Sequence, residues 1–270
     1  MLSILTDQIR SKQSFLCVGL DPVVEKLPVS LLSAADPMFE FCKRIIDATL
    51  PYAVAYKPNL AFFEANGSAG LASLERVIEY IPRECFAIAD AKRGDIGNTA
   101  EAYARAFFER MQFNAVTLSP YMGADSIAPF LTRKGKMAII LAKTSNAGSN
   151  DFQMLELSTG RPLYLEVVAQ CVSKWSPEQI MFVVGAQNAE ELTQIRAIAP
   201  GYFFLIPGFG AQGGKLSDVS HILVPGEAGI LANYSRQIIY ASSGDDFDLK
   251  AGEKACEIAK EMAQLLADQI

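Results

Sequence analysis

The residues best suited to chemistry lie in one segment, residues 89–99, which reads Ala-Asp-Ala-Lys-Arg-Gly-Asp-Ile-Gly-Asn-Thr. It follows a short apolar run and places two carboxylates and a lysine, Asp90, Lys92 and Asp95, within six residues. If the run from Phe86 to Asp90 is a strand, residues two apart share a face, so Asp90 and Lys92 point the same way. Asp95 then lies in the following loop, and the segment forms an alternating array of acids and bases.

Such a run can also be a solvated strand end whose surface ion pairs contribute only ~0–1 kcal/mol each. The rest of the chain argues against that reading, because other apolar runs also end in an isolated polar residue followed by Gly, Pro or Ser. These runs are Cys17 to Pro22, Val54 to Pro58, Leu141 to Ser145 and Phe203 to Gly208.

Strand-like apolar runs alternate with amphipathic stretches along the whole chain, which is typical of βα units in a mainly parallel sheet. The candidate strands are Phe15–Leu20, Ala53–Lys57, Phe86–Asp90, Ala115–Ser119, Met137–Ala142, Ile180–Val184, Phe203–Ile206 and Ala228–Asn233. Eight such units in about 250 residues predict one (β/α)8 TIM barrel domain, residues 1–270, with its chemistry at the carboxyl ends of the strands. Asp21, Lys57, Asp90 and Lys92 are then expected to meet there. The longer segment from Thr144 to Pro162 is expected to form a lid or an excursion.

Helix signals lie between these strands. The N-terminal residues predict an amphipathic helix, Asp36-Pro37 predicts the start of another, Asn188 with Glu191 resembles a capping box, and Thr99 is expected to cap the helix after the charged segment. Two apolar helix faces are predicted, Met38, Phe41, Cys42, Ile45 and Ile46 in one and Leu71, Leu74, Val77, Ile78 and Ile81 in the other.

Composition excludes several classes of protein. The 270 residues are 50% hydrophobic and carry a net charge of −6 with no long basic block, so nucleic acid is not an expected partner. The longest apolar run, Met137 to Ala142, is far shorter than the ~20 residues of a membrane span. The N-terminus has no basic leader and carries Asp7, so no signal peptide is expected and we predict a cytoplasmic protein without a membrane partner.

Neither the cysteines nor the histidine predicts a metal site. Five cysteines, an odd number at wide spacing without a Cys-x-x-Cys pair, fit reduced thiols. The single histidine, His221, has no neighbours at ligand spacing and is expected to be a loop or packing residue.

A glycine-rich segment, Pro207 to Gly214, follows the seventh candidate strand and contains Gly208-x-Gly210-x-x-Gly213. A dinucleotide site is not expected, since no helix-forming sequence and no acidic ribose ligand follow it. In a barrel, the loops after strands 7 and 8 often bind phosphate through backbone N–H groups. Arg236, at the expected start of the last helix, can grip the same anion. Turn glycines with a surface arginine are the alternative.

On these motifs the chain resembles the orotidine 5'-phosphate decarboxylases, cofactor-independent enzymes of pyrimidine biosynthesis, and within them a bacterial subgroup with longer chains. The similarity runs nearly end to end. It is carried by Gly19-Leu20-Asp21, Tyr56-Lys57-Pro58-Asn59, the run from Asp90 to Thr99, Thr144-Ser145-Asn146, the run from Pro207 to Gly214, and Ser235-Arg236.

The resemblance implies that Lys57, Asp90, Lys92 and Asp95 form a charged catalytic tetrad. Asp95 and Thr99 would reach into the site of a partner subunit, which implies a homodimer. No cofactor and no metal are implied.

The resemblance also implies how the substrate, orotidine 5'-monophosphate, is held. Asp21 and Lys57 would bind ribose hydroxyls, Ile96 would line the pyrimidine pocket and Ser145 would touch the pyrimidine. The sequence departs from the family pattern directly after Ser145, at Asn146-Ala147. The substrate-binding set would be completed around the phosphate by Pro207, Gly208, Gly210, Gln212, Ser235 and Arg236.

The implied reaction yields uridine 5'-monophosphate and CO2. Loss of CO2 from C6 leaves a carbanion that no cofactor delocalises, so a fixed cation must stabilise it. Lys92 would do this electrostatically and then protonate C6 as a general acid. Lys57 and Asp90 would hold its ammonium in place, with Asp90 beside the departing carboxylate.

Two other functions share parts of this pattern. Mg²⁺-dependent phosphosugar decarboxylases and hexulose-phosphate synthases share the barrel and an Asp-x-Lys-x-x-Asp run, but they are expected to have an acidic metal ligand where this chain has Lys57. A catalytically silent nucleotide-binding barrel is the third possibility. The tetrad argues against it, because two buried lysines facing two buried aspartates are costly to keep unless they are paired.

Overall fold

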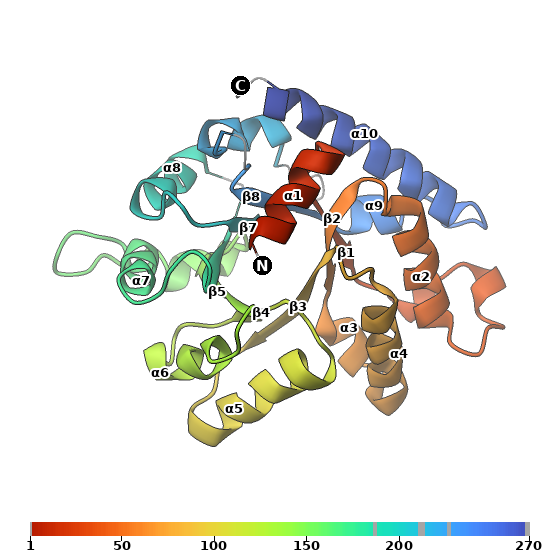
Figure 1. Cartoon of the computed structure of the whole chain (residues 1–270), viewed down its shortest axis with the longest axis horizontal. Helices are drawn as coiled ribbons and strands as arrows, with labels where there is room; N and C mark the ends of the chain where they lie inside the picture. Colours follow the sequence, from red (N-terminus) through yellow and green to blue (C-terminus); the bar gives the residue numbers. More distant parts are fainter. Residues whose placement is uncertain (1, 186–187, 210–213, 226–227, 268–270) are drawn as a thin grey trace.

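Eight parallel strands close into a barrel in the computed structural model, which describes residues 2–185, 188–209, 214–225 and 228–267. The strands follow one another around the barrel in chain order (Figure 1). They are β1 (Leu16–Leu20), β2 (Ala53–Pro58), β3 (Phe86–Arg93), β4 (Ala115–Leu118), β5 (Met137–Lys143), β6 (Ile180–Val184), β7 (Phe204–Ile206) and β8 (Ile230–Tyr234). The predicted (β/α)8 TIM barrel is therefore confirmed. The largest difference in strand ends is at β3, which continues past Asp90 to Arg93.

Most of the helices form an outer ring around the strands, whereas the N-terminal helix lies in front of the strands in this view (Figure 1). The helices are α1 (Leu2–Lys12), α2 (Pro37–Thr49), α3 (Leu60–Glu64), α4 (Gly67–Tyr80), α5 (Gly97–Arg105) with a π-helical continuation (Ala106–Arg110), α6 (Ala124–Ile127), α7 (Leu163–Val172), α8 (Ala189–Ile198), α9 (Arg236–Ile239) and α10 (Phe247–Ala267). Short 3-10 helices cover Val24–Lys26, Val29–Leu31, Ala128–Leu131, Ala147–Asp151 and Leu216–Ile222. Among the described residues, no helix combines the length and apolar character that crossing a membrane requires.

The predicted helix starts are confirmed at Asp36 and Asn188. The Asp36 carboxylate accepts a hydrogen bond of 3.0 Å from the Phe39 N–H, and the Asn188 side chain accepts from the N–H groups of Glu190 and Glu191. Thr99 is not a cap, and that prediction was wrong. The Ile96 carbonyl accepts the first helical hydrogen bonds of α5, so this helix begins before Thr99.

The apolar face predicted for α2 is buried in full, whereas the face predicted for α4 needs one correction. Leu71 is 39% exposed, although Leu74 and Val77 are buried. Gly70 lies against the backbone of the preceding helix, since a Cβ there would come within 2.0 Å of the Phe63 carbonyl oxygen. Close packing at Gly70 directs that side of the helix inward, and the adjacent Leu71 is left near the surface.

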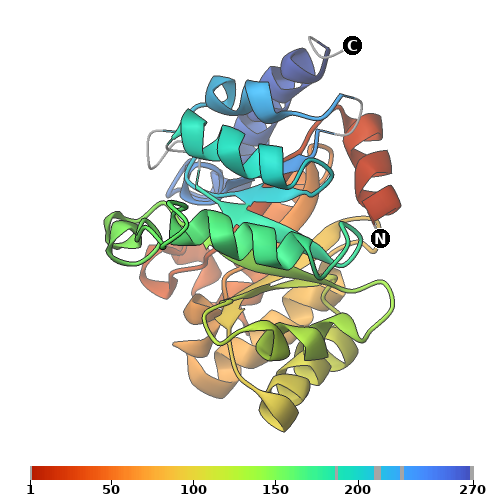
Figure 2. The ribbon, with the colours of Figure 1, turned by 90° about the vertical axis from the view of Figure 1, so that its left-hand side faces the viewer.

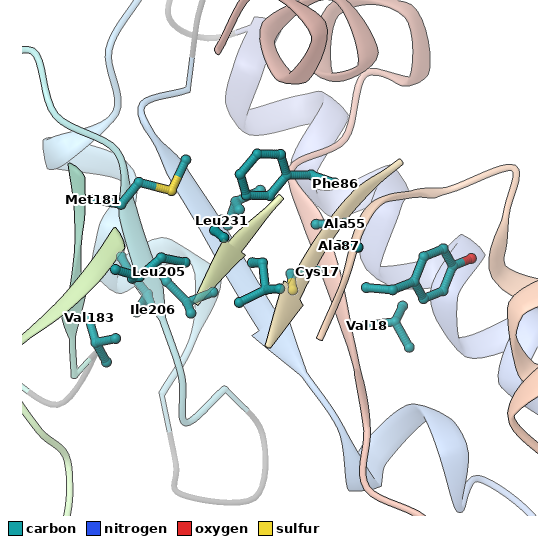
Figure 3. Packing of buried hydrophobic residues seen from close by; sticks show 14 of the residues in the cluster. Cys17, Val18, Ala55, Phe86, Ala87, Met181, Val183, Leu205, Ile206 and Leu231 are labelled. Atoms are coloured by element: carbon teal, nitrogen blue, oxygen red, sulfur yellow. The ribbon is translucent and has the colours of Figure 1, made fainter. Parts of the chain in front are cut away.

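The core fills the barrel and the layer between strands and helices. Both faces of the parallel strands are covered, so the strands consist of nearly continuous apolar runs. Figure 3 shows side chains from the barrel strands packed together, among them Cys17, Val18, Ala55, Phe86, Ala87, Met181, Val183, Leu205, Ile206 and Leu231. All five cysteines are free, and burial raises the pKa of the Cys17 thiol to about 12.

The two ends of the barrel differ. At the amino end of the barrel, the Lys12 ammonium on α1 donates a hydrogen bond of 2.7 Å to the carbonyl of Ala53, the first residue of β2. In the side view, α1 lies on the right and the segment after β5 projects on the left (Figure 2). Polar residues enter the strands at their carboxyl ends, where Lys57, Lys143 and Asn233 are buried.

Candidate active site

A buried carboxylate lies between two lysines at the carboxyl ends of β2 and β3. The Lys57 Nζ is 2.7 Å from Asp90 Oδ2, and the Lys92 Nζ contacts the other oxygen, Asp90 Oδ1. The Lys57 and Asp90 side chains are 6% and 10% exposed. The structure therefore brings Lys57, Asp90 and Lys92 together, as predicted.

The electrostatics of this cluster follow from burial and pairing. Burial alone raises the pKa of the Asp90 carboxyl, but the charges of Lys57 and Lys92 outweigh it and lower this pKa to about 2. Burial alone lowers the pKa of Lys57, whereas the charges of Asp90 and Asp21 raise it above its ordinary value. Asp90 and Lys57 therefore stay ionised together across the neutral pH range.

The expectation of four buried charges needs a correction in the single chain. The Lys92 side chain is 52% exposed, because it follows the last inward-facing part of β3 and lies at the mouth of the barrel. Asp95 is only partly buried. Within the described residues, Asp95 forms no ion pair with either lysine, and its Oδ1 accepts from the Ile96 N–H at 2.8 Å. Ile96 and Thr99 are also exposed.

Asp21 lies just beyond β1, near Lys57. Its Oδ1 is buried without a hydrogen-bond partner among the described residues. The loop that carries it is held by Tyr240, whose hydroxyl donates to the Asp21 carbonyl at 3.0 Å and accepts from the Val23 N–H at 2.7 Å. Sequence reasoning missed Tyr240, because nothing local to residue 240 indicates a contact with the other end of the chain.

The segment after β5 is braced at its base. Gln153 accepts from the Thr144 N–H at 2.8 Å and donates to the Thr144 hydroxyl at 2.9 Å. Ser145 packs against Gly185, where any Cβ would lie 3.1 Å from it. The predicted excursion is thus an ordered segment with a 3-10 helix at its start.

A second buried lysine, Lys143, ends β5. Its Nζ donates to the Ser149 hydroxyl at 2.8 Å and lies 4.0 Å from the Glu191 carboxylate. Lys143 is the polar residue at the end of the apolar run Leu141 to Ser145. It joins the segment after β5 to the start of α8.

The first residues of the glycine-rich segment, Pro207 to Phe209, lie beside the end of β8. Gly208 has φ of +100°, which favours glycine, and Phe209 stacks on Tyr234 with ring centroids 5.3 Å apart. Pro207 precedes this turn. Gly210 and Gln212 lie outside the described residues, so the structure gives no account of them.

Ser235 and Arg236 directly follow Tyr234. Arg236 is exposed and begins the helix α9, but the prediction that this is the last helix was wrong, because α10 follows at Phe247. The Ser235 side chain lies against Gly19 on β1, where a Cβ would be only 1.8 Å from the Ser235 Oγ. The end of β8 thus approaches β1 closely enough to require glycine at position 19.

The backbone that carries Lys92 is irregular. Lys92 has φ of +47°, and both its N–H and that of Ala91 donate to the hydroxyl of Thr117 on β4. The next residue, Arg93, turns outward to pair with Glu64. Sequence reasoning missed Thr117, because its role depends on the register between two strands.

Comparisons with known proteins agree with this arrangement. Residues 14–245 match the model of the family described as "Orotidine 5'-phosphate decarboxylase / HUMPS family". The chain belongs to this family. A Flavobacterium johnsoniae relative named orotidine 5'-phosphate decarboxylase is 51% identical over 265 residues, 97% of each chain. A Porphyromonas gingivalis relative of the same name is 50% identical over 261 residues, 96% of this chain and 95% of the relative.

Solved structures within the family have the same architecture. A putative orotidine-monophosphate-decarboxylase from Toxoplasma gondii has a TM-score of 0.85 at 36% identity, covering 98% of this chain and 97% of that one. The orotidine-monophosphate decarboxylase of Leishmania donovani has a TM-score of 0.84 at 37% identity, covering 98% of each. The family resemblance read from the motifs is confirmed.

Proposed function

We propose that this chain decarboxylates orotidine 5'-monophosphate to uridine 5'-monophosphate and CO2 at the Lys57–Asp90–Lys92 cluster, without a cofactor. The family and the names of its relatives support the reaction. The observation that carries the site is the Asp90 carboxylate held between two lysine ammonium groups. This arrangement supplies a fixed cation next to a fixed anion at the mouth of a barrel.

Lys92 is the group we assign to the reacting carbon. When the C6–carboxylate bond breaks, its electron pair stays on C6, and the Lys92 ammonium stabilises this charge. The same ammonium then donates a proton to C6, which completes the product. Its exposure in the single chain leaves its Nζ open to a substrate at the barrel mouth.

Asp90 and Lys57 set the position and charge of Lys92. The pKa of Asp90 near 2 keeps that carboxylate ionised, so it holds the Lys92 ammonium by charge as well as by contact. Lys57, on the buried side, balances the second oxygen of Asp90. Asp90 thus presents Lys92 to the substrate and lies beside the carboxylate that leaves.

The ribose is assigned to Asp21 and Lys57. The Asp21 Oδ1 is buried with no hydrogen-bond donor among the described residues, and a ribose hydroxyl is a donor of the kind that it lacks. An unsatisfied buried carboxylate oxygen costs free energy, so a hydroxyl that satisfies it gains affinity.

The phosphate and the pyrimidine are assigned to the neighbouring loops. The phosphate is assigned to Arg236 at the start of α9, to Ser235 directly before it, and to the turn of Pro207 and Gly208, whose neighbour Phe209 stacks on Tyr234. Gly210 and Gln212 complete this proposed phosphate site from outside the described residues. The pyrimidine is assigned to Ser145 on its braced segment, with Ile96 lining the pocket.

A homodimer would complete the tetrad. Asp95 has no lysine partner within the described part of its own chain, and it is available, with Thr99, to the site of a second copy. Exposed apolar side chains follow the adjacent strands β3 and β4. Ile96 follows β3, Tyr121 and Met122 follow β4, and Tyr121 is 91% exposed. Association of two copies through this surface would bury them. We propose that this dimer works in the cytoplasm.

The test is turnover of orotidine 5'-monophosphate by the purified protein in EDTA, followed by ultraviolet absorbance. We expect conversion that Lys92→Ala lowers about 10³-fold or more, since one residue supplies both charge stabilisation and the proton. Lys134→Ala is the matched control, because Lys134 is an exposed lysine remote from the cluster, and it should leave the rate unchanged.

Three results would count against the proposal. A folded wild-type protein that does not convert orotidine 5'-monophosphate would contradict the proposed reaction. Equal rates for wild type and Lys92→Ala would show that Lys92 does not take part in the reaction. Activity on a sugar phosphate that requires added Mg²⁺ would instead favour a Mg²⁺-dependent phosphosugar decarboxylase or hexulose-phosphate synthase.

A further inference from the structure

The register between β3 and β4 changes at the point where the charged cluster begins. Ala89 pairs with Val116, and the next pair is Arg93 with Leu118, so β3 advances four residues while β4 advances two. The intervening residues of β3, from Asp90 to Lys92, form a bulge. Bulges re-aim side chains and leave local backbone groups without ladder partners.

The hydroxyl of Thr117 replaces the missing ladder partners. Its Oγ1 accepts from the Ala91 N–H at 3.0 Å and from the Lys92 N–H at 2.9 Å. Its proton is directed to Asp90 Oδ1 at 3.3 Å, with the Ala89 carbonyl at 3.5 Å as the alternative. These contacts use both acceptor positions and the single donor of a hydroxyl. Thr117 is 1% exposed, so bulk solvent does not reach these hydrogen bonds.

The backbone that Thr117 holds is conformationally unusual. Lys92 has φ of +47°, in the left-handed region that residues with a Cβ rarely adopt. Such a conformation persists only where its surroundings determine it. The two N–H groups bound by one oxygen supply that constraint, directly at Lys92 and at the residue before it.

We propose that Thr117 is a positioning residue for the decarboxylation, which holds the Asp90–Lys92 bulge in the geometry that presents the Lys92 ammonium to C6. This inference rests on the proposed function for the role of Lys92. Thr117 itself acts through the backbone of Ala91 and Lys92 and through the Asp90 carboxylate.

The test compares Thr117→Val, which keeps the shape and removes the hydroxyl, with Thr117→Ser, which keeps the hydroxyl. We expect Thr117→Val to lower kcat about 30- to 300-fold while KM, and the Kd for uridine 5'-monophosphate, stay within about threefold. Thr117→Ser should stay within about threefold of wild type in kcat. If Thr117→Val does not fold, Thr117→Ala replaces it with the same expected split.

Thr49→Val is the matched control. Thr49 is also a buried threonine, with its hydroxyl on the Ile45 carbonyl at 2.7 Å, but it lies on α2 outside the cluster. Its loss should lower thermal stability and leave kcat unchanged. A loss of kcat in Thr49→Val equal to that in Thr117→Val would show a general effect of removing a buried hydroxyl, and would overturn the proposal.

A crystal structure of Thr117→Val gives a readout that does not depend on activity. We expect Lys92 to leave the positive-φ region and its Nζ to leave Asp90. An unchanged bulge, a kcat within threefold of wild type, or a Thr117→Ser variant as slow as Thr117→Val would each overturn the proposal. If wild type does not turn over orotidine 5'-monophosphate, the proposed function fails, and this crystal structure alone still decides whether Thr117 sets the backbone at Lys92.

Discussion

The Lys57 ammonium lies 2.7 Å from Asp90 Oδ2 in a pair whose two side chains are at most 10% exposed. Lys57 ends β2 and Asp90 lies on β3, so the pair joins two adjacent strands at their carboxyl ends. Removing one member of such a buried pair is costly, because the other is left as an uncompensated buried charge. The pair therefore links stability to the same carboxylate that holds Lys92.

Replacing Asp90 with asparagine should destabilise the protein by about 3–5 kcal/mol, because Lys57 would be left as a buried ammonium without its carboxylate. Urea unfolding of Asp90→Asn measures this loss. Asp248→Asn is the control, since the Arg44–Asp248 pair is about one-third exposed and should contribute only ~0–1 kcal/mol. Equal losses in the two variants would contradict the importance we give to burial.

Acid should destabilise the protein through Asp90. Its pKa lies near 2 in the folded chain, below the ordinary value of 3.8, so the folded state favours the ionised form. The resulting stability, about 2 kcal/mol, is complete above pH 4 and is lost as the pH falls toward 2. Urea unfolding between pH 5 and pH 2 measures it, and Asp90→Asn should show a shallower fall over this range.

The loop that carries Asp21 should depend on the Tyr240 hydroxyl. Tyr240→Phe removes the bond to the Asp21 carbonyl and leaves the Val23 N–H without its acceptor. We expect KM for orotidine 5'-monophosphate to rise about three- to tenfold with little change in kcat, because a ribose contact is displaced while Lys92 is not. Tyr80→Phe, which removes an exposed bond to Asp47, should change neither constant.

Position 19 should tolerate only glycine. In Gly19→Ala, the new Cβ would lie 1.8 Å from Ser235 Oγ and 2.9 Å from Ser235 Cβ, so rotation of the hydroxyl alone does not relieve the overlap and β1 or the start of α9 must shift. We expect a stability loss of about 1–3 kcal/mol, as for other overpacked sites, and weaker binding of inorganic phosphate. Gly201→Ala is the control, because its Cβ would meet only Pro177 Cγ at 3.6 Å. Thermal unfolding and phosphate titration would reveal whether Gly19→Ala is instead accommodated.

The sequence alone determined the barrel and most of the charged cluster. Eight apolar runs that alternate with amphipathic stretches indicate the barrel, because parallel strands covered on both faces must be almost wholly apolar. A polar residue that ends such a run, as Lys57 and Asp90 do, lies at the carboxyl end of its strand. Active sites of (β/α)8 barrels are built at these ends. Local capping by Asp36 and Asn188 was equally readable, because a cap is made by neighbours in the chain.

Only the tertiary structure decided how these residues are held. The bulge at Lys92 depends on the register of β3 against β4, the support from Thr117 depends on that bulge, and the support of Asp21 by Tyr240 joins residues 219 positions apart. The exposure of Leu71 was decided by close packing at Gly70. Hydrophobic periodicity specifies which residues are inside an element, but contacts between elements depend on register and close packing, and these arise only when the whole chain is folded.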